Sequence, residues 1–147
     1  MIFVTVGTGK FDSIIKEIDR ISPTLKEKII AQIGNGKYVP KNFKYFRFNQ
    51  SLDEYYKKSK LIISHGGAGT IYELLKMKKK VIAIANLDRT DSHQEEILNA
   101  LSQENNLIWC KNVREIEGII KKSNSIHLKK YKKPQCMIHH KIKEFLG

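Results

Sequence analysis

The sequence predicts an α/β fold in which one parallel β-sheet carries helices on both faces. Short apolar runs rich in β-branched residues alternate with segments of helical spacing along the whole chain. Two of these runs, 2–6 and 61–64, end in glycine-containing turns that lead into helices. A third run, 81–85, is apolar throughout, as in a parallel strand that is buried on both faces. Because parallel strands are joined by right-handed crossovers, both glycine turns should lie at one edge of the sheet.

The individual elements follow in a regular order. The expected strands are 2–6, 28–33, 45–48, 61–64, 81–85 and 107–109. The expected helices begin at or near Phe11, Leu52, Ala68, Asp91 and Val113, the last two ending near Gln103 and Ile120. The first helix has apolar residues at helical spacing, and Gly34-Asn35-Gly36 forms a strong turn after the second strand. We therefore expect a Rossmann-like domain at 1–122 and a basic helical tail at 123–147. The tail should end in a helix after Pro134 that either packs on the domain or docks a partner subunit.

Length and composition indicate a soluble cytoplasmic protein. A chain of 147 residues is one domain by size, and 41% hydrophobic with 29% charged residues is an ordinary soluble balance. No apolar run has the length of a membrane helix, and the first residues are too few for a signal peptide. The two cysteines, Cys110 and Cys136, lack the spacing of a zinc site, so we expect no metal and a reducing compartment.

The formal charge of +12 leaves several partners open. Much of the excess lies in the lysines of residues 121–143. A solvated lysine-rich face accounts for most of it, and attraction to an anionic membrane leaflet is the second interpretation. Tyr131 is the only aromatic residue within the lysine run at 129–133, which gives little support to a base-stacking surface.

The turn after the fourth strand is a candidate phosphate site. Residues 65–70 read His-Gly-Gly-Ala-Gly-Thr, and a helix starts at about Ala68. The amides and the positive dipole end of a helix N-terminus bind phosphate groups. The spacing differs from both the Walker A and the G-x-G-x-x-G patterns. Glu73 falls one turn into the helix, within reach of sugar hydroxyls. Tight packing of strand against helix is the alternative explanation of the glycines.

Three motifs together resemble one family. They are His65-Gly66-Gly67-Ala68-Gly69-Thr70 with Glu73, Val4-Thr5-Val6-Gly7-Thr8 with Lys10-Phe11-Asp12, and Asp91-Ser92-His93-Gln94. In this order they resemble the GT-B glycosyltransferases related to MurG. The similarity is greatest to the small Alg13-like proteins, which consist of the C-terminal, donor-binding half of a family 28 enzyme. The resemblance runs from Met1 to about Trp109 and implies one half of a GT-B fold.

The resemblance also implies roles for individual residues. The UDP-sugar site would comprise Gly7, Thr8, Phe48, Asn49, His65, Gly66, Gly67, Ala68, Gly69, Thr70, Glu73, His93 and Gln94. The segment of Phe48 and Asn49 would hold the uracil ring, and His93 or Gln94 the donor sugar. Three alternatives remain at this point. Phe48 would be a core residue, and Asp91 and Gln94 would form a helix capping box. Lys10, more than Thr8, would belong to a plain strand–helix connection.

The function implied by the resemblance is glycosyl transfer by two subunits. This chain would bind a UDP-sugar (UDP-GlcNAc, UDP-galactose or UDP-glucuronate) and transfer the sugar to a lipid-linked acceptor in polysaccharide or glycolipid synthesis. An Alg14-like membrane-associated subunit would supply the acceptor site and the catalytic base, and would bring the chain to the cytoplasmic face of the membrane. No cofactor is expected. The alternative is a non-catalytic nucleotide-sugar sensor or a basic nucleic-acid-binding domain.

Overall fold

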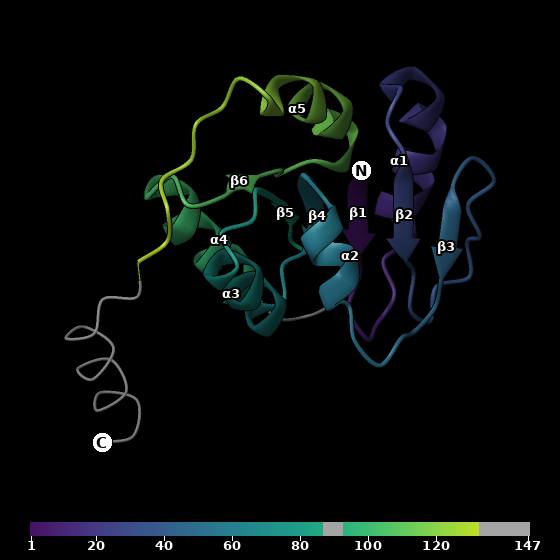
Figure 1. Ribbon diagram of the computed structural model, residues 1–147, viewed down its shortest axis with the longest axis horizontal. Helices are drawn as coiled ribbons and strands as arrows, with labels where there is room; N and C mark the ends of the chain where they lie inside the picture. The colour runs from purple at the N-terminus through teal and green to yellow at the C-terminus, as the bar shows by residue number, and fades with distance from the viewer. Residues whose placement is uncertain (87–92, 133–147) are drawn as a thin grey trace.

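The protein folds around a six-stranded parallel sheet, with strand order β3-β2-β1-β4-β5-β6 (Figure 1). The structure is a computed structural model that describes residues 1–86 and 93–132. Its elements are β1 (Ile2–Thr5), α1 (Asp12–Leu25), β2 (Ile29–Gln32), β3 (Lys44–Phe46), α2 (Asp53–Lys58), β4 (Leu61–His65), α3 (Ala68–Lys76), β5 (Val81–Ile84), α4 (His93–Gln103), β6 (Ile108–Trp109), the 3₁₀ turn η1 (Val113–Glu115) and α5 (Ile116–Ser123). The predicted fold class is confirmed.

Helices cover both faces of the sheet. Helices α1 and α5 pack on one face, where alternate strand residues such as Ile2, Val4 and Ile63 meet the isoleucines of α1. Helices α2, α3 and α4 pack on the other face, against Phe3 and Ile62. The period-two alternation of a strand therefore feeds two separate apolar clusters. This explains why the first three residues of β1 and of β4, and all four of β5, are apolar.

The two glycine turns lie next to each other at the carboxyl edge of the sheet. Strand β1 pairs with β4 in parallel, so that Thr5 lies beside Ser64 and the turn that follows each strand starts at the same level. From this pair the strands follow one another outward in sequence order, through β2 to β3 on one side and through β5 to β6 on the other. Such a reversal point is where open α/β sheets bind ligands.

The third strand is shorter than predicted, and Phe48 lies outside it. Strand β3 ends at Phe46. Its partner β2 turns away at Gly34, which has a φ of +60°, so the residues after Arg47 have no strand to pair with. Phe48 is 55% exposed. The interpretation of Phe48 as a core residue is therefore wrong.

Two carboxylates of α1 hold the long loop between β2 and β3. Asp19 is buried and accepts hydrogen bonds from the Tyr38 hydroxyl (2.5 Å) and from the backbone N–H groups of Lys41 and Asn42. Asp12 accepts the N–H groups at the start of the same loop. Burial opposes ionisation of Asp19, but these hydrogen bonds outweigh it, and its pKa is lowered. The loop is therefore fixed to the outer helix by charge-assisted bonds.

The described part of the tail packs on the domain. Ser123, where the predicted tail begins, is still within α5, and residues 124–132 run back past α4 and α3. The Lys129 N–H donates to the Asn105 carbonyl at 2.8 Å, and the Tyr131 ring lies 5.9 Å from that of Tyr72. The predicted final helix after Pro134 lies outside the described residues.

Candidate functional site

The turn between β1 and α1 is shaped by one buried glutamine. Gln32, at the end of β2, is 3% exposed. Its Oε1 accepts the Gly7 N–H (3.1 Å) and the Thr5 hydroxyl (2.7 Å), and its Nε2 donates to the carbonyls of Gly7 (2.7 Å) and Arg47 (2.8 Å). Gly7 has a φ of +72°, a conformation that strains any side chain. Gln32 thus holds the first turn and the segment after β3 in one arrangement.

The turn between β4 and α3 is built around His65. The Gly67 N–H donates to Nδ1 of His65 at 3.1 Å. The imidazole fills the space between the two turns, since a Cβ at Gly67 would lie 2.3 Å from its Cε1 and a Cβ at Gly7 would lie 2.6 Å from its Nε2. Helix α3 has no side-chain N-cap, and a Cβ at Gly69 would meet nothing within 4 Å. Gly7 and Gly67 are therefore required by packing against His65, whereas Gly69 leaves open space at the helix start.

A pocket of about 400 Å³ opens at this carboxyl edge. It collects residues from the ends of β1 and β2, the first glycine turn, the segment after β3, and helices α2 and α3. The lining residues are Thr5, Gly7, Thr8, Gln32, Phe48, Asn49, Gln50, Ser51, Leu52, Asp53, Tyr56, Thr70 and Glu73. Among them are six of the predicted site residues, namely Gly7, Thr8, Phe48, Asn49, Thr70 and Glu73. Residues predicted from three separate stretches of sequence thus border one space.

The other predicted residues lie around this pocket rather than in its lining. The backbone of residues 65–69 forms the adjacent loop and first helical turn. Gln94 is buried behind that loop, where its Oε1 accepts the Asn86 N–H at 3.1 Å and lies 2.9 Å from the position of a Cβ at Gly66. His93 is exposed on α4, with its Nδ1 3.6 Å from a carboxylate oxygen of Glu96. The proposed capping residue Asp91 lies outside the described residues.

Sequence reasoning missed Gln32, Asp53 and Tyr56. A lone polar residue at the end of an apolar strand, two residues before a turn glycine, was the available signal for Gln32. Tyr56 carried no such signal, because its place at helical spacing from Leu52 marks it as a core residue. Burial, followed by the charges of Glu73 and Asp53, raises the pKa of Tyr56 to about 12. Its phenol therefore keeps its proton at neutral pH.

The pocket is acidic, although the chain as a whole is basic. The lining includes the carboxylates of Asp53 and Glu73 and no lysine or arginine. An anionic ligand would have to be held there by backbone N–H groups and by the dipole of α3. The carboxylates would be left to accept hydrogen bonds from neutral hydroxyl groups. A sugar nucleotide presents both kinds of group.

The described part of the chain offers no metal cluster, no membrane-spanning helix and no reactive thiol. Residues 1–86 and 93–132 contain no cluster of three His, Cys, Asp or Glu side chains that could hold a metal ion. Over the same residues, no helix is both long and apolar enough to cross a membrane. Burial raises the pKa of the Cys110 thiol to about 11, so this thiol is not a nucleophile at neutral pH.

The sheet order and the two glycine turns define a class of protein, the Rossmann-like half of a GT-B glycosyltransferase. The crystal structure of Acinetobacter baumannii MurG matches with a TM-score of 0.66 at 15% identity, over 85% of this chain and 42% of that one. The solution structure of ALG13 matches with a TM-score of 0.63 at 20% identity, over 90% of this chain and 89% of that one. These likenesses concern the fold.

The chain belongs to the glycosyltransferase family 28 C-terminal domain, whose family model matches residues 1–146. It is 34% identical to the human UDP-N-acetylglucosamine transferase subunit ALG13 over 122 residues, which are 74% of this chain and 11% of that protein. It is 33% identical over 119 residues to a Clostridium botulinum (strain Hall) N-acetylglucosamine transferase that acts on a pyrophosphoryl-undecaprenol acceptor. The match covers 79% of this chain and 32% of that relative, so the chain spans a minor part of both.

Proposed function

We propose that the chain is the UDP-sugar-binding subunit of a glycosyltransferase that acts on a lipid-linked acceptor. The observation that carries the proposal is the carboxyl-edge pocket, in which the first glycine turn, the segment after β3, and Thr70 and Glu73 of α3 border one space. The pyrophosphate would lie over residues 66–70, with its charge facing the N-terminus of α3. The ribose hydroxyls would donate to Glu73. The uracil would lie along the exposed segment of Phe48 and Asn49.

The transfer itself needs groups that this pocket does not supply. In the reaction, the acceptor hydroxyl oxygen forms a bond to the anomeric carbon of the sugar, the bond from that carbon to the pyrophosphate oxygen breaks, and the hydroxyl proton passes to a base. Backbone N–H groups, with Thr8 or Thr70, would stabilise the leaving UDP. The two carboxylates of the described lining, Asp53 and Glu73, would accept hydrogen bonds from neutral hydroxyl groups and so would not act as the base. We therefore assign the base and the acceptor site to a partner subunit.

The donor can be named from the relatives. The human and clostridial relatives are both named as N-acetylglucosamine transferases, which favours UDP-GlcNAc over UDP-galactose and UDP-glucuronate. A partner of the Alg14 type, associated with the membrane, would complete the enzyme and bring it to the cytoplasmic face. Purified chain should therefore bind UDP but show little transfer to a lipid acceptor until that partner is added. Full turnover by the single chain would contradict the two-subunit proposal.

A binding experiment tests the donor site. Glu73→Ala should weaken UDP binding by about 1–3 kcal/mol, the scale of hydrogen bonds to a charged group, as measured by calorimetry. Glu73 is exposed, so the variant should unfold at the same urea concentration as the wild type. Glu54→Ala is the matched control, since Glu54 is an exposed helical glutamate on α2 outside the pocket lining. Equal UDP affinity in both variants would exclude Glu73 from the site.

The tail from residue 123 is a second expectation to be tested. We propose that its terminal part docks the partner subunit. Because residues 126–132 pack on α3 and α4, truncation is best placed after Lys132, which leaves the Tyr131–Tyr72 contact intact. A truncated chain that binds UDP but no longer co-purifies with its partner would support docking. Loss of folding on this truncation would show that the tail belongs to the core.

A further inference from the structure

The lysines of the described chain gather at one edge of the sheet. Four segments, 26–28, 57–60, 76–80 and 121–122, contain eleven lysines and a single acid, Glu27. Each segment lies at the end of a helix or between that helix and the next strand. We call these four segments the basic edge. Lys121 and Lys122, the first lysines of the basic stretch 121–143, belong to the basic edge as the last turn of α5.

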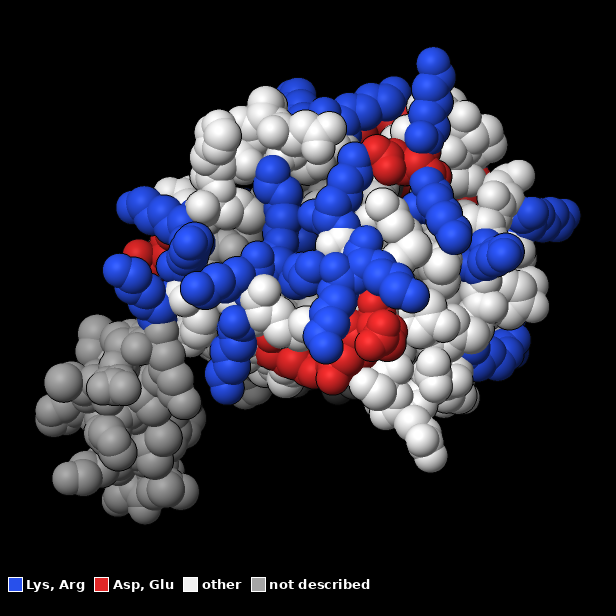
Figure 2. Space-filling model, in the orientation of Figure 1, with Lys and Arg blue, Asp and Glu red and all other residues white. Residues whose placement is uncertain are grey.

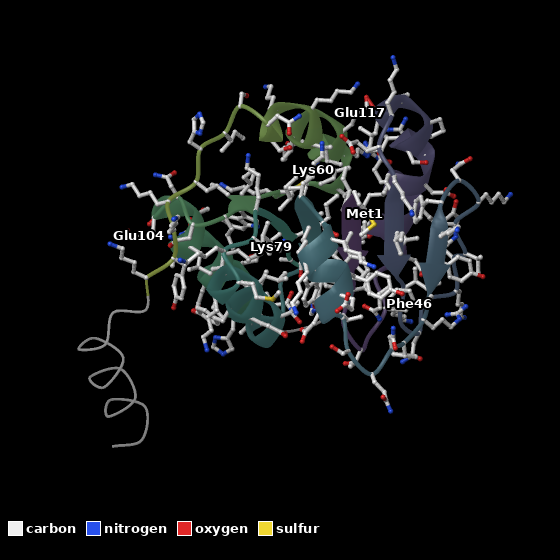
Figure 3. All side chains as sticks on the ribbon, viewed as in Figure 1. Met1, Phe46, Lys60, Lys79, Glu104 and Glu117 are labelled. Carbon is white, nitrogen blue, oxygen red and sulfur yellow. The ribbon has the colours of Figure 1, made fainter. Side chains whose placement is uncertain are left out.

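Hydrogen bonds show that these segments meet in space. The Lys60 N–H donates to the Met1 carbonyl at 3.0 Å, and Nζ of Lys79 donates to the Ser59 carbonyl at 3.2 Å; Met1, Lys60 and Lys79 are labelled in Figure 3. A second pocket, of about 320 Å³, is bordered by lysines of three segments, Lys60, Lys80 and Lys121. Because all strands are parallel, this edge is the amino edge, opposite the donor pocket.

The basic edge has one acid among its eleven lysines, whereas acidic and basic side chains are mixed at the carboxyl edge. Acidic residues begin the helices at the carboxyl edge, with Asp12 in α1, Asp53 and Glu54 in α2, and Glu95 and Glu96 in α4. Figure 2 shows the Lys and Arg side chains spread over the middle and upper part of one face, with a group of acids below them. The donor pocket uses none of this positive charge, because its lining contains no lysine or arginine.

Helix dipoles explain only part of the basic edge. A lysine in the last turn of a helix offsets the negative dipole end, and Lys57, Lys58 and Lys76 fit this role. Lys60 and residues 78–80 lie in the connections after the helices. Their positive charge adds to the edge without belonging to a helix end. The accumulation therefore exceeds what helix stability requires.

We propose that the basic edge binds the surface of an anionic phospholipid bilayer. All its cations are lysines, which act as point charges on long stems, and arginine, the usual reader of bases and bidentate phosphates, is absent from it. The large hydrophobic residues most exposed in the described chain, Val39, Tyr45 and Phe48, lie elsewhere, so the edge offers no stacking platform for single-stranded nucleic acid. A broad lysine surface suits a charged plane, where each lysine adds to the attraction.

The contact would fix the orientation of the protein. With the amino edge on the bilayer, the donor pocket at the carboxyl edge stays open to a soluble sugar nucleotide. The chain would thus touch the membrane directly, in addition to any attachment through a partner. This inference does not rest on the UDP site, and vesicle binding and UDP binding are measured separately.

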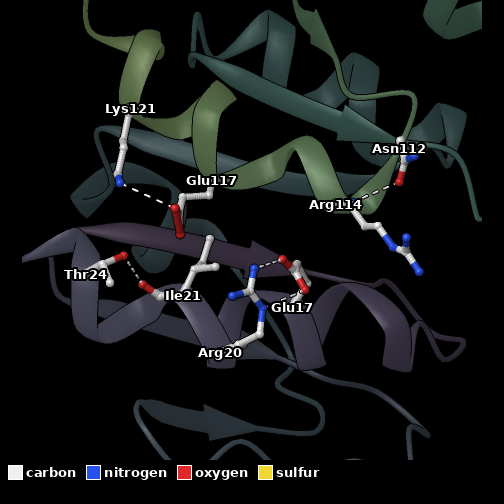
Figure 4. A network of polar contacts seen from close by, with 8 residues as sticks. All are labelled: Glu17, Arg20, Ile21, Thr24, Asn112, Arg114, Glu117 and Lys121. Carbon is white, nitrogen blue, oxygen red and sulfur yellow. Dashed lines mark hydrogen bonds and ion pairs between the residues drawn. The ribbon is translucent and has the colours of Figure 1, made fainter.

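Vesicle flotation tests the proposal with two variants of equal charge change. The edge variant replaces Lys57, Lys58, Lys76 and Lys122, all exposed and free of assigned side-chain bonds, by Gln. Lys121 is left in place because it pairs with Glu117 at 3.5 Å (Figure 4). The control variant replaces Lys10, Lys16, Lys37 and Lys111, which lie in or near the carboxyl-edge loops and the start of α1, by Gln. Both variants keep the same C-terminal tail.

The wild type should float with vesicles of 70% phosphatidylcholine and 30% phosphatidylglycerol, and not with pure phosphatidylcholine. Binding should weaken steeply between 50 and 300 mM salt, on the order of the loss expected for several screened charges. The edge variant should bind at least roughly tenfold more weakly than the control variant. Urea denaturation of both variants, with midpoints equal to that of the wild type, shows that they are folded.

Three results would overturn the proposal. One is no binding of the wild type to the anionic vesicles at 50 mM salt. Another is an equal loss in the two variants, which would mean that only net charge matters. The third is displacement of the protein from vesicles by duplex DNA at equal phosphate concentration, which would assign the edge to nucleic acid.

Discussion

The two glycine turns at the carboxyl edge look alike in sequence but are held in different ways. The first turn, residues 7–10, is tied by side chains from other strands: Gln32 holds Gly7, and Nδ2 of Asn86 donates to the Lys10 carbonyl at 2.8 Å. The second turn, residues 65–69, uses its own histidine, whose Nδ1 accepts the Gly67 N–H. Only the second turn leaves open space at a helix start, at Gly69. The first turn is thus held by side chains from distant parts of the chain, whereas the second turn is held by its own histidine and leaves space at a helix start.

Replacing Gly7 should have the largest effect. Gly7→Ala places a Cβ 2.6 Å from Nε2 of His65 on a backbone with a φ of +72°. We expect a loss of about 2–4 kcal/mol in the free energy of unfolding, measured by urea denaturation, together with loss of UDP binding. Gly118→Ala is the control, because a Cβ there meets nothing within 4 Å. A Gly7→Ala protein as stable as the wild type would show that the first turn is not fixed.

Replacing Gln32 should have the second largest effect on stability. Gln32→Leu leaves the Gly7 N–H and the carbonyls of Gly7 and Arg47 without their bonds to that side chain. The expected cost is about 1–3 kcal/mol of stability. UDP affinity, measured by calorimetry, should fall as well, since the first turn and the segment after β3, which Gln32 holds, both border the pocket. If stability falls and UDP affinity does not, the first turn has no part in the site. Gln103→Leu, at an exposed position in the last turn of α4, is the control.

Acid should loosen the loop behind the first turn. The pKa of Asp19 is lowered in the folded protein from its ordinary value of 3.8, so its ionised form stabilises the fold at any pH above that value. This contribution is lost as the pH falls through the lower, folded pKa. In urea titrations between pH 7 and pH 2.5, the wild type should lose stability below about pH 4. Asp19→Asn should be less stable by about 1–2 kcal/mol at pH 7.

The difference between the wild type and Asp19→Asn should narrow toward pH 2.5. A gap that stays constant over the titration would mean that the charge of Asp19 contributes nothing and that only its shape matters. Asp53→Asn is the comparison, because Asp53 is exposed at the start of α2.

The smallest effect on stability is expected at Gly69. Gly69→Ala adds a methyl group in open space within the first turn of α3, so stability should be unchanged or higher by about 0.5–1 kcal/mol. UDP binding should nevertheless weaken, by about tenfold, because the methyl group occupies the approach to the helix N-terminus. Unchanged UDP affinity in calorimetry would move the pyrophosphate away from the second turn.

Several features followed from the sequence because their causes are local. Apolar runs of strand length, helical spacing and turn glycines depend on neighbouring residues, and they predicted all six strands and their parallel direction. The position of both glycine turns at one edge followed from the handedness of crossovers, which is a property of the backbone. The predicted grouping of Thr8, Phe48 and Glu73 came from motif resemblance, and the pocket lining contains all three.

Other features were decided only by the tertiary structure, because they depend on residues far apart in the chain. Gln32 acts on Gly7 across 25 positions, and no local pattern marks that pair. Phe48 reads as a core residue and is exposed because its partner strand turns away at Gly34. In the sequence, the lysines are interpreted as a solvated face, with much of the excess at residues 121–143. They form one basic edge because every crossover helix runs antiparallel to the strands and so delivers its carboxyl end to the same side of the sheet.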